Sequence, residues 1–426
     1  MKIAVVGGGS TYTPELVSGL VRERARLPVR ELVLHDIDPV RREVVGGLAA
    51  RILARDGYHG RLDVTDVLDR ALDGADAVIV QIRVGGQAAR LLDETVPLPC
   101  GCIGQETTGA GGLGKALRTV PVVLEIAERA RELAADDAWI VDFTNPVGIV
   151  TRALLDAGHR AVGLCNVAIG FQRLSARLLG VEPDRVVVDH VGLNHLTWVR
   201  RLLLDGEDVL PELLEAHGEE IARHANIPLR LIEDLGAVPS SYLHYFYFHD
   251  EVLEEQRGGA VPRATAVAEI ERELLELYRD PELTQKPPQL ELRGGAYYSE
   301  AAVGLLASLT DGAGDVHVVD VRNDGTVDGL AADDVVEVPA RIERTGPVPL
   351  EQAPLAPELL GLVQHVAAYE RLAAAAATSG DRTLVWKALL AHPLVGQDDP
   401  AVELTRRLLE AGEDHLPRFA AALEAS

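Results

Sequence analysis

The first 165 residues alternate between short apolar segments and longer amphipathic ones. The apolar segments are rich in Val, Ile and Leu and are bounded by turn-forming residues: KIAVVGG, ELVLHD, AVIVQ, WIVDFTN and AVGLC. Between several of them lie segments with helical periodicity, such as PELVSGLVRERARL, VRREVVGGLAARILARDG and LRTVPVVLEIAERARELA. Alternation of this kind predicts a parallel sheet with helices on both faces, and therefore an α/β fold.

The pattern changes after His195. Helical periodicity dominates residues 207–236 and 262–280, β-branched residues are concentrated in 316–342, and helical patterns return from residue 356 onward. No repeat is visible in this half. We expect it to form a mixed α+β unit that packs against the parallel sheet.

Length and composition are those of an ordinary globular protein. Of its residues, 47% are hydrophobic and 25% are charged. A chain of 426 residues is too long to form one small core. We therefore expect two closely packed domains, residues 1–190 and residues 191–426. No apolar run reaches the length of a membrane span, and MKIAVVGGGS is typical of a strand rather than a charged signal peptide. These features predict a cytoplasmic protein.

The charge and the cysteines restrict the partners. The net charge of −25 is spread along the chain, which disfavours binding to nucleic acid and to anionic membranes. An anionic substrate would need local arginines to oppose that field. The three cysteines, Cys100, Cys102 and Cys165, cannot form a disulfide framework, and Cys-x-Cys is not a zinc spacing. A reducing compartment fits this pattern.

The segment VVGGGSTYTP connects the first predicted strand to the first predicted helix. Gly7 and Gly9 allow a tight turn and a close approach to a pyrophosphate, and Ser10 and Thr11 can add hydroxyl donors. Asp36 ends the second strand, where a carboxylate would bind a ribose hydroxyl and repel a 2′-phosphate. A glycine turn that only connects two elements is the simpler explanation, and a tyrosine replaces the third glycine of the usual fingerprint. The order strand, turn, helix and acidic second strand favours a Rossmann-like site for NAD rather than NADP.

Cys165 follows the apolar segment AVGL, and His195 follows thirty residues later in GLNHLTW. Cys165 is expected at the carboxyl edge of the sheet, where open α/β sheets bind ligands. A thiolate and an imidazole suit a divalent transition metal, and two protein ligands leave positions open for substrate. The alternative is a small buried hydrophobic residue and a hydrogen-bonded histidine, and the spacing alone does not decide between them.

Three further segments carry polar or aromatic residues. Asn145 lies in FTNPVGIV after a predicted strand, and Glu106 lies in IGQETTGAGGLG, which we interpret as a glycine-rich loop. PSSYLHYFYF contains five aromatic residues, whereas only 4% of the whole chain is aromatic. By themselves, Tyr245 and Tyr247 in this segment are predicted to be packing residues.

Taken in order, these segments resemble glycoside hydrolase family 4, the NAD- and divalent-metal-dependent glycosidases. The resemblance covers nearly the whole chain and rests on GGGSTYTPELV, LDETVPL, IGQET, FTNP, GLCN, GLNH, SSYLHYFYF and RGGAYYSEAA. Within the family, cysteine followed by asparagine is similar to the 6-phospho-β-glucosidases. Members that act on α-glucosides or α-galacturonides tend to have Asp or His after the cysteine.

The resemblance implies a catalytic centre built from four residues. Cys165 and His195 match the family's manganese ligands, and Tyr242 matches its catalytic base. Asn166 matches the catalytic position at which α-specific members have an acid. An amide cannot donate that proton, so no general acid is assigned.

The resemblance also implies residues that bind the substrate. Arg90, Asn145 and Arg263 match substrate-binding positions, and we add Asn166 and Glu106. Forked guanidinium donors are suited to a sugar phosphate. A surface ion pair is the commoner role for a single arginine, but the surrounding motifs favour phosphate binding.

The implied reaction differs from that of most glycosidases, which use two carboxylates. Hydride transfer from sugar C3 to NAD would make the C2 proton acidic, and a divalent metal, expected to be Mn²⁺, would stabilise the enolate. A tyrosinate would remove that proton. Because tyrosine normally has a pKa near 10, Tyr242 would need a nearby cation. β-Elimination of the aglycone, water addition at C1 and return of the hydride would follow.

We therefore predict hydrolysis of 6-phospho-β-glucosides, including phosphorylated disaccharides. Domain 1–190 would bind NAD, and domain 191–426 would provide catalysis, substrate binding and oligomerisation as a homodimer or homotetramer. The alternatives are a dehydrogenase of 2-hydroxy acids, a family member acting on another glycoside, and a non-catalytic NAD sensor. A dehydrogenase would accumulate NADH with substrate, whereas a sensor would not need Cys165, His195 or Tyr242.

Overall fold

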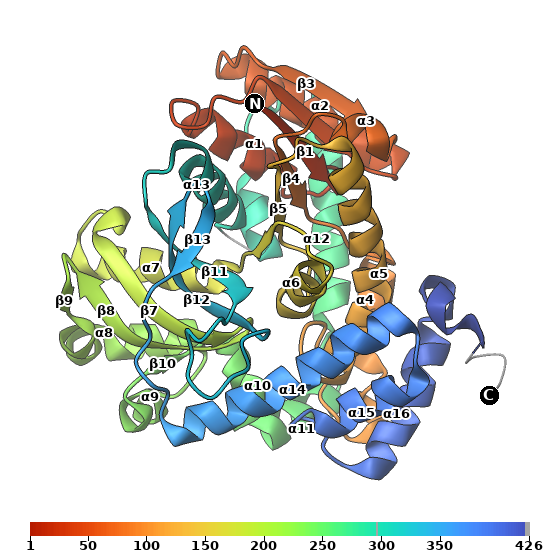
Figure 1. The fold of residues 1–426 in the computed structure, drawn as a ribbon, viewed down its shortest axis with the longest axis vertical. Coiled ribbons are helices and arrows are strands. Elements are labelled where there is room, and N and C mark those ends of the chain that lie inside the picture. The colour runs from red at the N-terminus through yellow and green to blue at the C-terminus, as the bar shows by residue number, and fades with distance from the viewer. Residues whose placement is uncertain (295–296, 422–426) are drawn as a thin grey trace.

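The computed structural model describes residues 1–294 and 297–421. Within these residues, thirteen strands form one continuous sheet (Figure 1). Its first half is parallel, in the order β3-β2-β1-β4-β5-β6. These strands are β1 (Lys2–Val6), β2 (Glu31–His35), β3 (Arg61–Thr65), β4 (Ala77–Val80), β5 (Trp139–Asp142) and β6 (Ala161–Gly163). This is the Rossmann order, so the predicted α/β fold with a Rossmann-like parallel sheet is confirmed.

Strand β3 was not among the predicted strands. Its sequence, RLDVT, has little apolar character, because β3 pairs with a neighbour on one side only and most of its residues stay partly exposed. An edge strand of this kind lacks the continuous apolar pattern of the buried strands.

Helices connect the parallel strands and cover both faces of the sheet (Figure 1). They are α1 (Thr13–Arg22), α2 (Pro39–Arg55), α3 (Leu68–Leu72), α4 (Gly86–Thr95), α5 (Gly109–Leu133) and α6 (Val147–Asp156), and α7 (Asn166–Leu179) leads from β6 to the antiparallel half. The predicted helical segments lie within or overlap α1, α2 and α5.

The glycine-rich segment before α5 is only partly a loop. We expected a loop throughout IGQETTGAGGLG, but α5 already begins at Gly109. A Cβ at Gly111 would lie 2.3 Å from two carbonyl oxygens, and a Cβ at Gly112 would lie 2.7 Å from the Thr107 carbonyl carbon. The glycines therefore allow the helix to pack directly against neighbouring backbone, which sequence periodicity does not reveal.

The second half continues the same sheet with antiparallel strands. Strand β11 (Val316–Arg322) pairs with β6, and the order continues through β12 (Val335–Glu343), β7 (Val186–Leu193), β8 (Leu196–Leu204) and β10 (Val238–Pro239). The short strands β9 (Glu207–Asp208) and β13 (Gly346–Pro349) pair with β8 and β12. The expected mixed α+β organisation of this half is confirmed.

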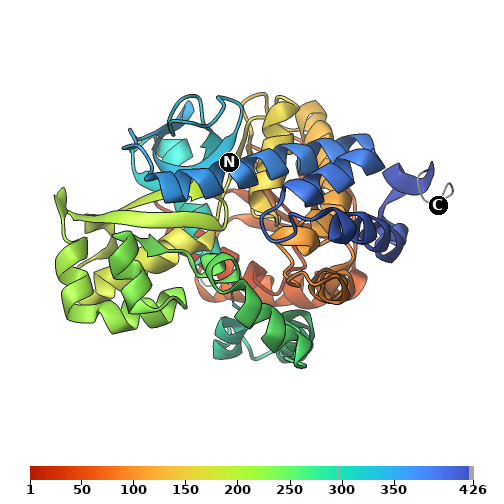
Figure 2. The same ribbon diagram turned by 90° about the horizontal axis from the view of Figure 1, so that it is seen from below.

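The remaining helices belong to the second half of the chain. They are α8 (Leu210–Ala225), α9 (Leu229–Leu235), α10 (His244–Tyr247), α11 (His249–Arg257), α12 (Arg263–Tyr278), α13 (Tyr298–Asp311), α14 (Pro357–Ser379), α15 (Arg382–Ala391) and α16 (Asp398–Ala411). Figure 2 shows the yellow-green lobe of α8 and α9 on the side of the molecule opposite the dark-blue C-terminal end of the chain. Helices α14, α15 and α16 pack against α5, so the end of the chain returns to the N-terminal half.

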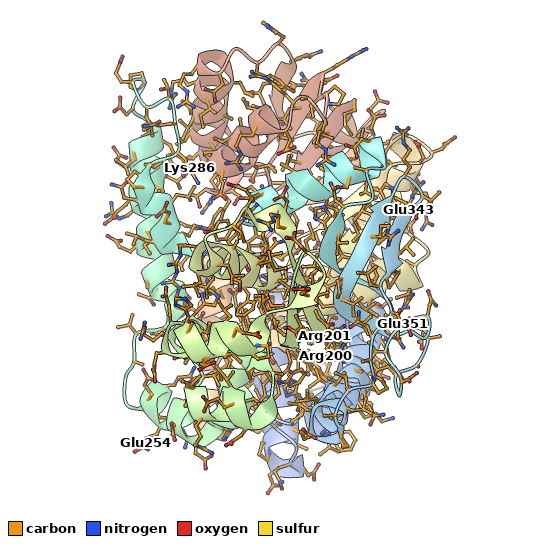
Figure 3. The ribbon with its side chains drawn as sticks, turned by 90° about the vertical axis from the view of Figure 1, so that its left-hand side faces the viewer. Arg200, Arg201, Glu254, Lys286, Glu343 and Glu351 are labelled. Atoms are coloured by element: carbon orange, nitrogen blue, oxygen red, sulfur yellow. The ribbon has the colours of Figure 1, made fainter. Side chains whose placement is uncertain are left out.

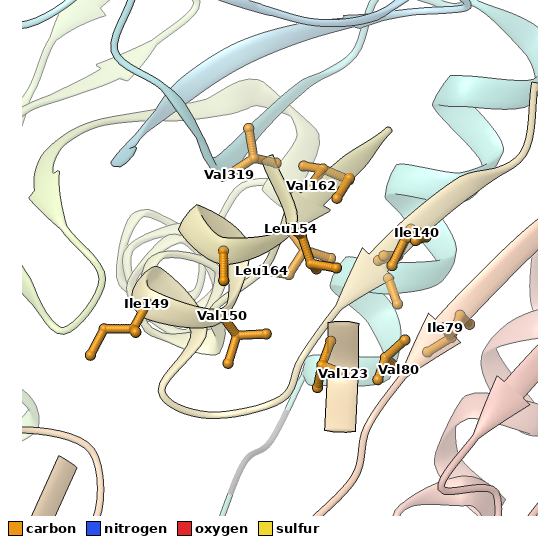
Figure 4. Close-up of a cluster of buried hydrophobic side chains, with 14 of the residues drawn as sticks. Ile79, Val80, Val123, Ile140, Ile149, Val150, Leu154, Val162, Leu164 and Val319 are labelled. Atoms are coloured by element: carbon orange, nitrogen blue, oxygen red, sulfur yellow. The ribbon is translucent and has the colours of Figure 1, made fainter. Parts of the chain in front are cut away.

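The main core joins the two halves of the sheet. Ile79, Val80, Ile140 and Val162 from the parallel strands meet side chains of α5 and α6, and Val319 of β11 extends the same cluster (Figure 4). Burial of each such side chain contributes on the order of 1.5–3 kcal/mol. The carboxyl ends of the parallel strands are thereby held against the antiparallel half.

The surface has charges of both signs. Figure 3 labels Arg201, Glu254, Lys286, Glu343 and Glu351, all of which are exposed, on one side of the molecule. Over residues 1–294 and 297–421, we find no helix with the length and apolar character required to cross a bilayer.

Candidate active site

A cavity of about 2010 Å³ lies at the carboxyl ends of the parallel strands. It extends from the loop after β1 to the segments around α10 and α12 in the second half of the chain. Its walls include nine of the predicted site residues: Gly7, Ser10, Asp36, Arg90, Glu106, Asn145, Asn166, Tyr242 and Arg263. The remaining four, Gly9, Thr11, Cys165 and His195, are not among its lining residues.

The loop after β1 has the tight conformation expected of a phosphate loop. Gly7 has φ +88°, and a Cβ there would lie 2.5 Å from the carbonyl oxygen of Gln81. The backbone N–H of Gly9 donates to Asp36 Oδ2 at 2.9 Å, so Asp36 supports the loop from the end of β2. Thr11 is fully buried and is not among the lining residues, whereas Ser10 lines the cavity.

His195 and Tyr242 are in face-to-face contact. Their ring centroids are 3.6 Å apart and their planes differ by 7°. His195 lies in the turn between β7 and β8 with φ 65°, and its Nδ1 lies 3.0 Å from Thr107 Oγ1. Its Nε2 is buried and has no hydrogen-bond partner among the described residues. Burial lowers the pKa of His195 to about 4, so the ring is neutral at physiological pH.

Cys165 follows β6 and precedes the first residue of α7, as the sequence predicted. Only 4% of the residue is exposed. Burial raises the pKa of its thiol well above the ordinary value, and the carboxylate of Glu337 raises it further. The side chain of Asn194 opposes this shift and also donates to Glu337 Oε2 at 2.7 Å.

Tyr242 lies in the short segment before α10. Burial raises the pKa of its hydroxyl well above 10, and Cys165 and Glu106 raise it further, whereas the guanidinium of Arg90 lowers it. The ring of Tyr245 is 6.4 Å from that of Tyr242 and inclined by 48°. Tyr247 accepts a hydrogen bond from Trp198 Nε1 at 3.1 Å and packs against the core. Tyr242 is therefore the tyrosine in contact with His195.

Glu106 is surrounded by three cationic side chains. Lys115 Nζ lies 2.5 Å from its Oε2, Arg90 Nη2 lies 3.2 Å from its Oε1, and Arg83 forms a further ion pair. Burial alone would raise the pKa of Glu106, but the three cations hold it well below its usual range. The carboxylate therefore keeps a cluster of positive charge in place at the cavity wall.

A second carboxylate, Glu94, connects Arg90 to the first turn of α12, the helix that begins at Arg263. Arg90 Nε donates to Glu94 Oε1 at 2.7 Å, and Glu94 Oε2 accepts from the backbone N–H of Ala264 at 2.8 Å. Arg263 Nη2 donates to the backbone carbonyls of Leu292 and Arg293 at 3.1 and 2.9 Å. The two predicted phosphate-binding arginines thus line one cavity from adjacent elements, α4 and α12.

Among the lining residues that sequence reasoning missed are Arg83, Lys115 and Tyr298. Arg83 comes three residues after β4 and could have been found from its place at the carboxyl edge. Lys115 lies inside α5 and is buried, and no local sequence pattern marks a buried lysine. Tyr298 begins α13 and hydrogen-bonds Asn145. It belongs to the motif RGGAYYSEAA, of which residues 295 and 296 lie outside the described structure.

Two family models match the chain. The model described as family 4 glycosyl hydrolase matches residues 2–181, and the model of its C-terminal domain matches residues 190–395. The chain belongs to glycoside hydrolase family 4. The predicted family is confirmed.

This family 4 chain is similar to several 6-phospho-β-glucosidases. A probable 6-phospho-β-glucosidase of Bacillus subtilis is 42% identical over 100% of this chain and 99% of its own length. A solved 6-phospho-β-glucosidase from Thermotoga maritima, with NAD and glucose-6-phosphate, superposes with a TM-score of 0.91 at 34% identity, over 97% of this chain and 99% of that chain. A second structure of that enzyme, with manganese, NAD⁺ and glucose-6-phosphate, gives a TM-score of 0.90 at 33% identity, with the same coverage.

The residues of this family 4 chain fit a divalent metal. His195 presents a buried Nε2 without a partner, beside a ring nitrogen already near Thr107. A neutral imidazole with one free nitrogen is the form that binds metals. Cys165 lies close enough to influence the pKa of Tyr242, which stacks on His195. The imidazole of His195 and the thiol of Cys165 therefore form a donor pair whose chemistry suits a divalent metal.

Proposed function

We propose that this family 4 chain hydrolyses 6-phospho-β-glucosides with NAD and a divalent metal. The route would be oxidation at sugar C3, removal of the C2 proton, β-elimination of the aglycone, addition of water at C1 and return of the hydride to C3. The observation that carries the proposal is the contact between Tyr242 and His195, at the wall of a cavity that also contains the phosphate loop and Arg90. Cofactor, base and phosphate-binding residues therefore share one space. The similarity to 6-phospho-β-glucosidases supports the same substrate class.

Two separate sets of residues would hold the two cofactors. Gly7, Ser10 and Asp36 would hold NAD, and Cys165 Sγ with His195 Nε2 would hold the metal, expected to be Mn²⁺. When bound, NAD supplies a hydride acceptor and the metal supplies positive charge for oxygen atoms of the sugar. The protein contributes the positions of these groups and the movement of protons.

Tyr242 is the residue that we assign to removal of the proton from sugar C2. Its phenolic oxygen would accept the proton after ionisation, and contact with the His195 ring holds the phenol in one orientation. In the protein alone, burial opposes that ionisation and Arg90 favours it. Additional positive charge near Tyr242 is therefore required for it to act as a base.

The phosphate group would bind between α4 and α12. Arg90 and Arg263 provide forked donors there, and Glu94 links the two helices. Asn145 and Asn166 line the same cavity and would contact sugar hydroxyls. Glu106 would act through the cations around it, because its carboxylate already pairs with Arg83, Arg90 and Lys115.

The decisive experiment is a panel of aryl glycosides, with and without a 6-phosphate, in both anomers and in the gluco and galacto configurations. Each would be assayed with NAD and Mn²⁺ after removal of metal by a chelator. We expect release of the aryl group from the 6-phospho-β-glucoside without accumulation of NADH. Preference for an α-anomer or another sugar would replace the substrate assignment, and steady NADH production from a 2-hydroxy acid would indicate a dehydrogenase.

Arg90→Lys tests the phosphate site within the same panel. Loss of the forked geometry should raise KM for the phosphorylated glucoside by roughly tenfold or more, because a charge-assisted hydrogen bond contributes about 1.5–3 kcal/mol. The non-phosphorylated glucoside should be unaffected. An equal change for both substrates would remove Arg90 from phosphate recognition.

We further propose a cytoplasmic homodimer or homotetramer with a division of labour between residues 1–190 and residues 191–426. The continuity of the sheet from β6 to β11 supports close packing of the two parts. Light scattering coupled to size-exclusion chromatography would measure the oligomeric state. A single monomeric species at micromolar concentration would contradict it.

A further inference from the structure

Three charged side chains form a connected group beside the phosphate loop. Glu271 of α12 accepts from Arg41 Nη2 through its Oε2 at 2.8 Å, and from Arg293 Nε and Nη2 through its Oε1 at 2.9 and 2.6 Å. The side chain of Glu271 is 6% exposed, whereas those of Arg41 and Arg293 are 29% and 15% exposed. All three line the large cavity.

The group is in direct contact with the loop after β1. The guanidinium of Arg293 lies over the ring of Tyr12, 4.5 Å from its centroid. Arg41 lies on α2 beside Gly9, where a Cβ on the glycine would be 2.8 Å from Arg41 Cβ. The two arginines therefore approach the phosphate loop from two different parts of the chain.

Helix α12 holds this arrangement in place. Arg263 begins the helix, Glu271 follows two turns later, and the hydroxyl of Tyr278 at the far end donates to the carbonyl oxygen of Thr11 at 2.8 Å. With 100° between successive residues, the three lie on one side of the helix. At about 1.5 Å per residue, Arg263 and Tyr278 are separated by roughly 22 Å along the axis. One helix thus spans the distance from the proposed sugar-phosphate site to the phosphate loop.

The charges are suited to an anion. Burial would raise the pKa of Glu271, but Arg293 and Arg41 lower it to about 2, so the carboxylate is ionised and orients both guanidinium groups. Asp38 lies 4.0 Å from Arg41 Nε, and its carboxylate is partly exposed and caps α2. Paired guanidinium groups with fixed orientation are typical of phosphate recognition.

We infer that Arg293 and Arg41, positioned by Glu271, bind the diphosphate of the nicotinamide dinucleotide. This inference rests on the proposed function, because it requires NAD as the cofactor. It adds residues from the second half of the chain to a site that the sequence placed in the first half alone. The diphosphate is thereby bound between the parallel sheet and α12.

The test is a set of equilibrium titrations of the purified chain with NAD, ADP-ribose, adenosine and glucose 6-phosphate. Arg293→Gln should weaken binding of NAD and of ADP-ribose by roughly tenfold or more, while adenosine and glucose 6-phosphate bind as in the wild type. Arg293→Lys should recover part of the loss, because it keeps the charge but not the fork. Arg272→Gln is the matched control, since Arg272 is exposed on the same helix and pairs with Glu269.

Thermal unfolding provides the second measurement. NAD should raise the unfolding temperature of the wild type, and this shift should be smaller for Arg293→Gln and for Arg41→Gln than for Arg272→Gln. Unchanged affinity of both variants for ADP-ribose, or a loss confined to glucose 6-phosphate, would overturn the inference. Because these titrations involve no hydrolysis, failure of the proposed glycosidase activity would be recorded separately from failure of this binding site.

Discussion

Replacement of Asp142 by asparagine should change the pH dependence of stability. Asp142 ends β5 and is completely buried. Its Oδ1 accepts from the backbone N–H of Thr144 at 2.9 Å, whereas its Oδ2 has no partner among the described residues. Burial raises its pKa from 3.8 to about 8, and the hydrogen bonds from Thr144 only partly oppose this. Asp142→Asn has nearly the same shape and keeps an acceptor for Thr144.

The sign and size of the effect follow from proton binding. Between pH 3.8 and about 8 the folded state keeps the Asp142 proton and the unfolded state has lost it. A group with a raised folded-state pKa therefore reduces the free energy of unfolding as pH rises, by about 1.4 kcal/mol per pH unit. From pH 5 to pH 8 the accumulated loss is about 4 kcal/mol. Asp142→Asn removes this loss.

Urea unfolding followed by circular dichroism at several values from pH 5 to pH 8 would measure it. We expect the difference in unfolding free energy between Asp142→Asn and wild type to grow with pH. Asp137→Asn is the matched control, because Asp137 is exposed five residues earlier in the chain. Parallel stability curves for Asp142→Asn and wild type would refute the reasoning, since they would mean that Asp142 ionises equally in both states.

Two further predictions concern the catalytic centre. Cys165→Ser and His195→Ala should each abolish turnover and weaken Mn²⁺ binding, measured by the electron paramagnetic resonance of free Mn²⁺, while NAD affinity is retained; Cys100→Ser, outside the cavity lining, should behave as wild type. Full activity of either ligand variant in metal-depleted buffer would contradict the metal assignment. Tyr242→Phe should retain the fold and lose ~10²–10⁴-fold in rate, and wild-type hydrolysis in D₂O should place deuterium at C2. A fully active Tyr242→Phe with an inactive Tyr245→Phe would transfer the role of base to Tyr245.

The sequence by itself determined the type of sheet and the identity of many of the residues in the cavity. Alternating strands and helices indicate a parallel sheet because each element must bury one side against the next. A glycine turn followed by an acidic strand end indicates dinucleotide binding because the turn lets the backbone approach a pyrophosphate and the carboxylate can bind a ribose hydroxyl. The motif resemblance supplied Cys165, His195 and Tyr242, and the roles of these residues stay predictions.

Only the tertiary structure decided how the charges are arranged. The pairing of Glu106 with Lys115 and Arg83, and of Glu271 with Arg293, joins residues from different elements, and no local pattern marks such pairs. From the sequence, the glycines at the start of α5 predict a loop. In the structure they allow the helix to pack closely against neighbouring backbone. Periodicity reports which face of an element is buried, whereas the partner that buries it depends on how distant segments pack. The pKa shifts of Asp142, His195 and Glu271 follow from that packing, because desolvation and nearby charges exist only once the chain has folded.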